Sequence, residues 1–245
     1  MRKLLLSLSL LLSQEGIAEP AALRFSVSES WSMPLMHLEN HQPTSGILLE
    51  IFDSLARQVG RQAEYHVMPR LRIQGALESA DIDVRCYIAK SWLGDLRGDY
   101  AWSVPILVQR DLLVAAPLTV GPYPEQFDNE VIGTVTGYNY PALQHLFDSH
   151  RLVREDARNQ EQVLRMLVAG RYNYAISNQL AMDWINRELP PEQRLKVVAT
   201  VSEQDAACLV RKDPALPVQQ ILDTLQAMRK SGEIQRIVEC YAPRR

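Results

Sequence analysis

The order in which strand and helix patterns alternate along residues 23–241 limits the fold of this chain more than any other feature. Apolar runs such as residues 23–28 and 130–135 are followed by segments with apolar residues at helical spacing, such as 47–59 and 160–169. Consecutive parallel strands need a crossover connection, which a helix supplies. The alternation therefore predicts an α/β fold with mostly parallel sheets.

The predicted strands and helices cover most of the chain. The predicted strands lie at residues 23–28, 63–67, 83–88, 111–116, 130–135, 152–153, 172–177, 195–201 and 206–211. The predicted helices lie at residues 47–59, 71–80, 141–149, 160–169, 179–188, 218–230 and 233–241. Residues 29–46 and 89–102 are rich in Pro, Gly and Trp, and they are predicted to be loops.

Residues 77–87 and 167–177 share one local pattern, ninety residues apart. In each, a helix ends, a short turn follows and a strand begins at Asp83 or Asn173. Together with the repeated order of elements, this echo predicts two similar lobes with a cleft between them. Ligands of open α/β sheets bind at the carboxyl ends of strands, and such a cleft can close by hinge bending. The loops expected to carry function are residues 28–34, 68–72, 86–97, 135–140 and 177–179.

The N-terminus has the pattern of a secretory signal peptide over residues 1–18. Arg2 and Lys3 precede an apolar run, and small residues lie near Ala18. The run has about half of the ~20 residues that a membrane span needs, and no later segment is apolar enough to cross a bilayer. The mature chain is therefore expected to be exported to the periplasm and not embedded in the membrane.

Composition excludes further classes. Of the 245 residues, 47% are hydrophobic, and this apolar fraction is too high for a disordered chain. The formal net charge is −3. A pI near 6.0 without a basic block argues against nucleic acid as a partner. The sequence shows no Ser-His-Asp set, P-loop, HExxH or CxxC motif. An enzyme is therefore not predicted.

Three cysteines, Cys86, Cys208 and Cys240, would meet an oxidising compartment after export. Three allow one internal disulfide and leave one thiol. They lie far apart and none has a His at ligand spacing, while His37 and His41 lie in a Pro-flanked stretch without a helical pattern. No metal and no cofactor is predicted.

Arg70, Arg72 and Tyr87 are candidate ligand contacts because of where they fall. Arg70 and Arg72 flank Leu71 at a predicted helix start, where a cation is unfavourable unless an anion is near. The anion can be a ligand or an internal carboxylate, and Arg72 is the preferred contact. Tyr87 lies at the end of a predicted strand, at the lip of the cleft, with a hydroxyl and a ring face to offer.

Six segments of the chain follow one another in an order that is itself informative. They are Leu23-Arg-Phe-Ser-Val-Ser, Gly46-Ile-Leu-Leu-Glu-Ile-Phe, Ala80-Asp-Ile-Asp-Val, Tyr100-Ala-Trp-Ser-Val-Pro-Ile, Ile132-Gly-Thr-Val-Thr-Gly and Leu225-Gln-Ala-Met-Arg-Lys-Ser-Gly-Glu-Ile-Gln-Arg-Ile. Their order and spacing resemble the periplasmic solute-binding proteins of ABC importers, in the family that binds polar amino acids. The resemblance implies a type II two-lobed fold, with lobe 1 at residues 23–115 plus 205–245 and lobe 2 at 120–203.

The resemblance also implies roles for particular residues. Trp31 stands where the family places an aromatic residue that stacks on the ligand. Thr136 and Tyr138 flank Gly137 in the turn that holds an anion in the family. Asn178 stands where many amino-acid binders carry an Asp for the ligand's ammonium group.

Arg97 is the nearest candidate for the arginine that binds the ligand carboxylate in the family. Its spacing and neighbours differ from the family pattern, and pairing with Asp95 or Asp99 is the alternative. The family fold also implies that Cys86 and Cys208 lie on neighbouring hinge strands. A disulfide between Cys208 and Cys240 is the competing arrangement.

The resemblance thus predicts a monomeric solute-binding protein that captures a small polar or anionic solute, amino acid-like or a carboxylate. Delivery to an ABC permease is the expected role. A ligand-sensing periplasmic partner of a membrane receptor is one alternative. A cleft enzyme of the cyclohexadienyl dehydratase type is another.

Overall fold

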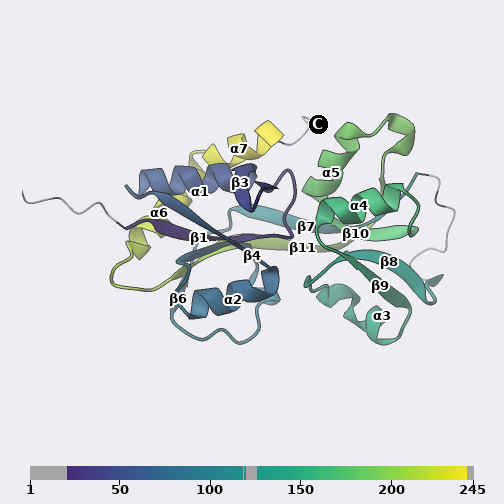
Figure 1. Ribbon diagram of the computed structural model, residues 1–245, viewed down its shortest axis with the longest axis horizontal. Coiled ribbons are helices and arrows are strands. Elements are labelled where there is room, and N and C mark those ends of the chain that lie inside the picture. The colour runs from purple at the N-terminus through teal and green to yellow at the C-terminus, as the bar shows by residue number, and fades with distance from the viewer. Residues whose placement is uncertain (1–20, 118, 120–125, 242–245) are drawn as a thin grey trace, which may run out of the picture.

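A computed structural model describes residues 21–117, 119 and 126–241, which form two lobes joined by two long strands (Figure 1). The predicted signal peptide lies outside the described residues. Lobe 1 contains β1 (Leu23–Ser28), β2 (His37–Glu39), β3 (Gln42–Ser45), β4 (Ala63–Met68), β5 (Val84–Ile88), β6 (Tyr100–Trp102), α1 (Ile47–Gln58), α2 (Arg70–Glu78), α6 (Val218–Lys230) and α7 (Glu233–Tyr241). Lobe 2 contains β8 (Glu130–Val135), β9 (Leu152–Ala157), β10 (Tyr174–Asn178), α3 (Gln144–Asp148), α4 (Gln160–Val168) and α5 (Gln179–Glu188). The connecting strands are β7 (Leu107–Ala115) and β11 (Lys196–Arg211).

The strands follow the order β4-β1-β5-β11-β7-β10-β8-β9. β1 is parallel to β4 and β5, and β8 is parallel to β9 and β10, whereas β11 runs antiparallel to β5 and β7. The predicted α/β fold with two mostly parallel sheets is confirmed.

β11 corrects one prediction, because residues 196–211 form a single strand where the sequence predicts two. Residues 202–205 are polar and mimic a turn in the sequence, but they pair with β7 where that strand crosses between the lobes. Ser202 donates a hydrogen bond to Asp111, and Glu203 forms an ion pair with Arg110. Side chains with polar partners on a neighbouring strand need no alternating apolar pattern.

The division between the lobes falls inside β7. Residues 111–115 pair with β10 of lobe 2, from Asp111 opposite Asn178 to Ala115 opposite Tyr174. The same residues pair with the first half of β11. The last five residues of the segment 23–115, expected in lobe 1, therefore belong to the lobe 2 sheet.

Two segments predicted as loops contain regular structure. β2 and β3 form a hairpin within residues 29–46, and Asn40 and His41 make its turn with positive φ values of 49° and 60°. The segment 89–102 holds a short 3₁₀ helix, Lys90–Trp92, and β6, which pairs with β11. Strands of three or four residues are too short to show a period in the sequence.

Apolar clusters on both faces of each sheet hold the lobes together. In lobe 1, Phe25 stacks on Phe52 of α1 at 4.6 Å between ring centroids, under α1, α6 and α7. On the opposite face, a smaller cluster that includes Ile73 and Leu77 lies under α2. Among the described residues, no helix combines the length and the apolar character needed to cross a bilayer.

A disulfide joins Cys86 of β5 to Cys208 of β11. The two residues are opposite each other in the antiparallel register, with Cα atoms 3.9 Å apart. Cys240 is an exposed free thiol on α7. Of the two disulfides that the sequence left open, the structure has the one that ties β5 to a connecting strand.

Candidate functional site

The loops at the carboxyl ends of the strands converge on a small cavity of about 20 Å³ between the lobes. Every loop that the sequence analysis selected contributes to it, from both lobes. The lining residues are Trp31, Arg70, Tyr87, Trp92, Gln109, Asp111, Tyr138, Asn139, Tyr140 and Asn178. We call this cavity the cleft.

Arg70 joins the two walls of the cleft. It is the first residue of α2 in lobe 1, and its Nε donates a hydrogen bond of 3.2 Å to the carbonyl oxygen of Gly137 in lobe 2. Its guanidinium carbon lies 4.7 Å from the ring centroid of Tyr138 and 5.9 Å from that of Trp92. These distances are typical of cation–π contacts. Gly137 has a φ of +76°, which suits glycine in this turn.

Aromatic rings form most of the lobe 1 wall. Tyr87 packs edge-on against Trp31 and Trp92, with ring centroids 6.3 Å and 6.5 Å apart. Tyr87 has a φ of +58° at the residue after Cys86, a conformation that is rare for a bulky side chain. Across the cleft, Ser30 donates a hydrogen bond of 3.4 Å to the hydroxyl of Tyr138. The wall combines ring faces with hydroxyl groups.

A polar chain runs along β7 at the base of the cleft. The Tyr87 hydroxyl donates to Gln109, whose Nε2 donates to Asp111 Oδ1 at 2.5 Å. Ser202 donates to the other carboxylate oxygen of Asp111 at 3.1 Å. Burial raises the pKa of Asp111, although these hydrogen bonds and the charge of Arg70 oppose the rise.

Gln109 and Asp111 are site residues that the sequence analysis missed. The sequence predicts Asp111 as the start of an ordinary strand, and Gln109 lies outside the predicted strands. The available signal was an Asp directly before the apolar run Leu-Leu-Val-Ala-Ala. A carboxylate at the start of such a run needs partners from elsewhere in the fold, and only the structure supplies them.

Asn178 lines the cleft, but its side chain also caps α5. Its Oδ1 accepts the backbone N–H of Ala181 at 2.8 Å. The amide NH2 group is then the part of the side chain that is left to contact a solute. The residue can therefore donate to a ligand more readily than it can accept.

Three predicted site residues do not line the cleft. Arg72 is exposed on α2, and Thr136 donates to the carbonyl oxygen of Ala157 at 3.2 Å. Arg97 is 91% exposed and pairs with Glu78 at 3.3 Å, not with Asp95 or Asp99. The structure thus brings together Trp31, Arg70, Tyr87, Tyr138 and Asn178, and leaves these three outside.

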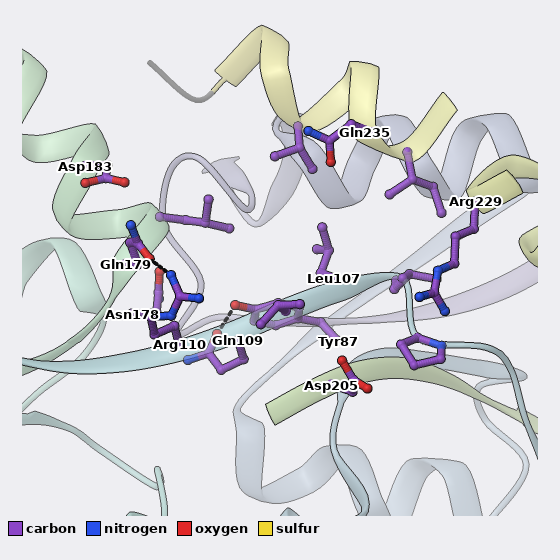
Figure 2. A pocket seen from close by; sticks show the side chains of 16 residues that line it. Tyr87, Leu107, Gln109, Arg110, Asn178, Gln179, Asp183, Asp205, Arg229 and Gln235 are labelled. Carbon is purple, nitrogen blue, oxygen red and sulfur yellow. Dashed lines mark hydrogen bonds between the residues drawn. The ribbon is translucent and has the colours of Figure 1, made fainter. Parts of the chain in front are cut away.

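A second and larger cavity of about 650 Å³ lies where α5 of lobe 2 faces α6 and α7 of lobe 1 (Figure 2). Asp183 projects from α5 on one side and Arg229 from α6 on the other. Arg110 donates to Gln179 at 2.6 Å near its floor. The second cavity shares Tyr87, Gln109 and Asn178 with the cleft, so both cavities adjoin the β7 strand that connects the lobes.

Comparison with known proteins adds structural relatives only. No family model matches the sequence, and no curated protein matches it. Solved structures do match, and the three described here are each matched over 91% of this chain and 98% of their own length. An ancestral arginine-binding protein bound to arginine superposes with a TM-score of 0.72 at 18% identity. The GluR0 ligand-binding core with L-glutamate gives 0.73 at 14% identity. A histidine kinase sensor domain with similarity to periplasmic binding proteins gives 0.71 at 20% identity.

These matches span both lobes and the strands between them. Matches at sequence identities of 20% or less show a shared architecture, but they do not identify the ligand. The alternating elements, the two lobes and the matched structures agree on one assignment. The chain has the two-lobed, type II fold of the periplasmic amino-acid-binding proteins.

Proposed function

We propose that the chain is an exported solute-binding protein that captures a small polar or anionic solute, amino acid-like or a carboxylate, in the cleft. The observation that carries the proposal is the convergence of loops from both lobes on one cavity with aromatic, cationic and carboxylate side chains. Solved structures with this fold are described as bound to arginine or L-glutamate. Both are small polar solutes.

Capture requires the lobes to separate. A cavity of about 20 Å³ has room for about one water molecule, so an amino acid does not fit between the lobes as they stand. The contacts that close the cleft are Arg70 with Gly137 and Ser30 with Tyr138. We expect the solute-free protein to open by bending within β7 and β11, which breaks these two hydrogen bonds, and the lobes to close again over a bound solute.

We propose that the protein acts as a monomer in the periplasm and delivers the captured solute to an ABC permease. A ligand-sensing partner of a membrane receptor is the second candidate, because a sensor domain of a histidine kinase shares the fold. A cleft enzyme is less well supported. Asp111 is the carboxyl group in the cleft, and both of its oxygens accept hydrogen bonds from the protein.

A thermal-shift screen with amino acids, polyamines, dicarboxylates and aromatic acids tests the proposal. A solute present at 100 times its dissociation constant should add about 2.7 kcal/mol to the free energy of unfolding. Small-angle scattering should then show a smaller radius of gyration with the solute than without it. A solute that stabilises the protein without compaction would contradict capture by lobe closure.

Arg70→Ala should weaken binding of that solute at least tenfold, because it removes a cation that lines the cleft. Arg72→Ala is the matched control, two residues away on the same helix and exposed. We expect it to bind as the unmodified protein does. Isothermal titration calorimetry of both variants measures the difference, and equal affinities would place the solute elsewhere.

A further inference from the structure

Arg85 is a buried arginine two residues before Tyr87 of the cleft, and it takes no part in the contacts described so far. It lies on β5 between Val84 and Cys86, which both belong to the cluster under α1, α6 and α7. Because side chains alternate along a strand, Arg85 is directed to the opposite face, which α2 covers. The residue is 6% exposed.

Two other arginines on this face show how such a charge is normally compensated. Arg24 and Arg211 both bind the buried carboxylate of Asp83, at 2.6 Å and 2.9 Å. Arg85 has no ion pair with any described residue, and its Nη1 has no hydrogen-bond partner. A buried charge without a partner is strongly unfavourable, so this one calls for an anion that the chain itself does not supply.

Ser26 is a second unpartnered group beside Arg85. The β1–β5 register places Phe25 opposite Val84, so Ser26 and Arg85 are the next residues on adjacent strands and share a face. Ser26 is 1% exposed, and its Oγ has no hydrogen-bond partner. Two unsatisfied polar side chains thus lie side by side under α2.

The surroundings of this pair are positive. α2 begins after Pro69, and no side chain caps its N-terminus. Burial, and then the charge of Arg70, lower the pKa of Arg85 to about 10, so Arg85 remains a cation at neutral pH. Arg70 lines the cleft, and its charge also acts on Asp111. A residue that lines the cleft therefore acts electrostatically on the unpaired guanidinium of Arg85.

We propose that Arg85 and Ser26, on the sheet face that α2 covers, form a binding site for a small oxyanion. The inference rests on the proposed function in one respect, because it assigns this site to the anionic group of the captured solute. A guanidinium binds carboxylate or phosphate oxygens through paired N–H groups, and the serine hydroxyl donates one more hydrogen bond. The N-terminus of α2 favours the same charge.

The test is calorimetric titration with two probes, inorganic phosphate and succinate, at constant ionic strength. Arg85→Met keeps the stem of the side chain and removes the charge, and we expect it to weaken binding of the probes at least tenfold. Ser26→Ala should weaken it by about twofold to fivefold. Lys230→Met removes an exposed cation at the end of α6, on the other face of the lobe 1 sheet, and should change nothing.

A second readout separates a binding role from a structural one. Without added anion, Arg85→Met should melt at the same temperature as the unmodified protein or higher, because it removes an uncompensated buried charge. A lower melting temperature together with unchanged probe affinity would assign Arg85 to structure and overturn the proposal.

The two probes distinguish the source of the oxyanion. Binding of succinate alone indicates a carboxylate of the solute, binding of phosphate alone indicates a tetrahedral anion, and binding of both indicates a general oxyanion site. Each supports the proposal if Arg85→Met abolishes it. The proposal is overturned if neither probe binds at 10 mM, or if Lys230→Met weakens probe binding as much as Arg85→Met does.

The outcome also separates this site from the proposed function. If the screened solute loses affinity in Arg70→Ala but not in Arg85→Met, the solute-binding role stands and the assignment of the oxyanion site to the solute falls. If Arg85→Met loses phosphate or succinate but no solute compacts the protein, the oxyanion site stands and capture by lobe closure falls.

Discussion

Replacement of both Cys86 and Cys208 by Ala should lower the free energy of unfolding by about 4–5 kcal/mol. The disulfide joins residues 122 positions apart, and a cross-link that closes so long a loop restricts the unfolded chain strongly. For a chain of this length, the loss corresponds to a fall in melting temperature of roughly 10 °C or more. Calorimetry of the oxidised protein and of the double variant measures it.

Cys240→Ala is the matched control for this prediction. Cys240 is exposed and makes no disulfide, so its replacement should leave the melting temperature unchanged. A reducing agent should destabilise the unmodified protein and the Cys240 variant equally, and it should have no effect on the double variant. A double variant as stable as the unmodified protein would show that the disulfide contributes no net stability.

Asp83→Asn should lower the free energy of unfolding by about 3–5 kcal/mol. Asp83 is 1% exposed and accepts hydrogen bonds from Arg24 and Arg211 at 2.6 Å and 2.9 Å. The backbone N–H of Arg24 donates a further hydrogen bond to the carboxylate of Asp83. Removing the carboxylate leaves the charges of Arg24 and Arg211 without their buried partner, and breaking a buried ion pair in this way costs about 3–5 kcal/mol. Urea unfolding at neutral pH measures the loss.

The pH dependence of stability gives an independent check on Asp83. Burial opposes its ionisation, but hydrogen bonds from Arg24 and Arg211 outweigh burial and hold its pKa below the usual value. The contribution of Asp83 is therefore fully present above its unfolded pKa of about 3.9 and is lost as the pH falls through the lower folded pKa. The unmodified protein should lose stability between these values more steeply than Asp83→Asn. Asp81→Asn, at an exposed residue two positions away, should follow the unmodified protein.

Most of the fold could be predicted from the sequence because long elements carry a clear period. Residues 130–135, 179–188 and 218–230 form the elements expected, with the expected bounds. The predictions were wrong where an element is short or where its environment is mixed. β2 and β3 are too short to show a period, and the middle of β11 is polar because its side chains face hydrophilic partners beside the cleft.

The candidate site was predictable only as far as position along the chain determines it. Trp31, Arg70, Tyr87, Tyr138 and Asn178 lie at or just after the carboxyl ends of strands, and parallel strands bring these ends to one edge. Gln109 and Asp111 lie within a connecting strand, where no comparable rule applies. The sequence preferred Arg72 to Arg70, and the structure lines the cleft with Arg70. Which of two arginines on one helix turn reaches the cleft depends on how the helix is rotated against the sheet.

The sequence by itself determined the alternation of strands and helices, the repeat of the two lobes and the loops that would meet. These are local properties, since periodicity and turn residues act within a few positions of the chain. Only the tertiary structure decided which cysteines pair, which arginines find a carboxylate and which one, Arg85, finds none. Those outcomes depend on residues that are far apart in sequence, such as Asp83 and Arg211, and become neighbours when the connecting strand pairs with β5.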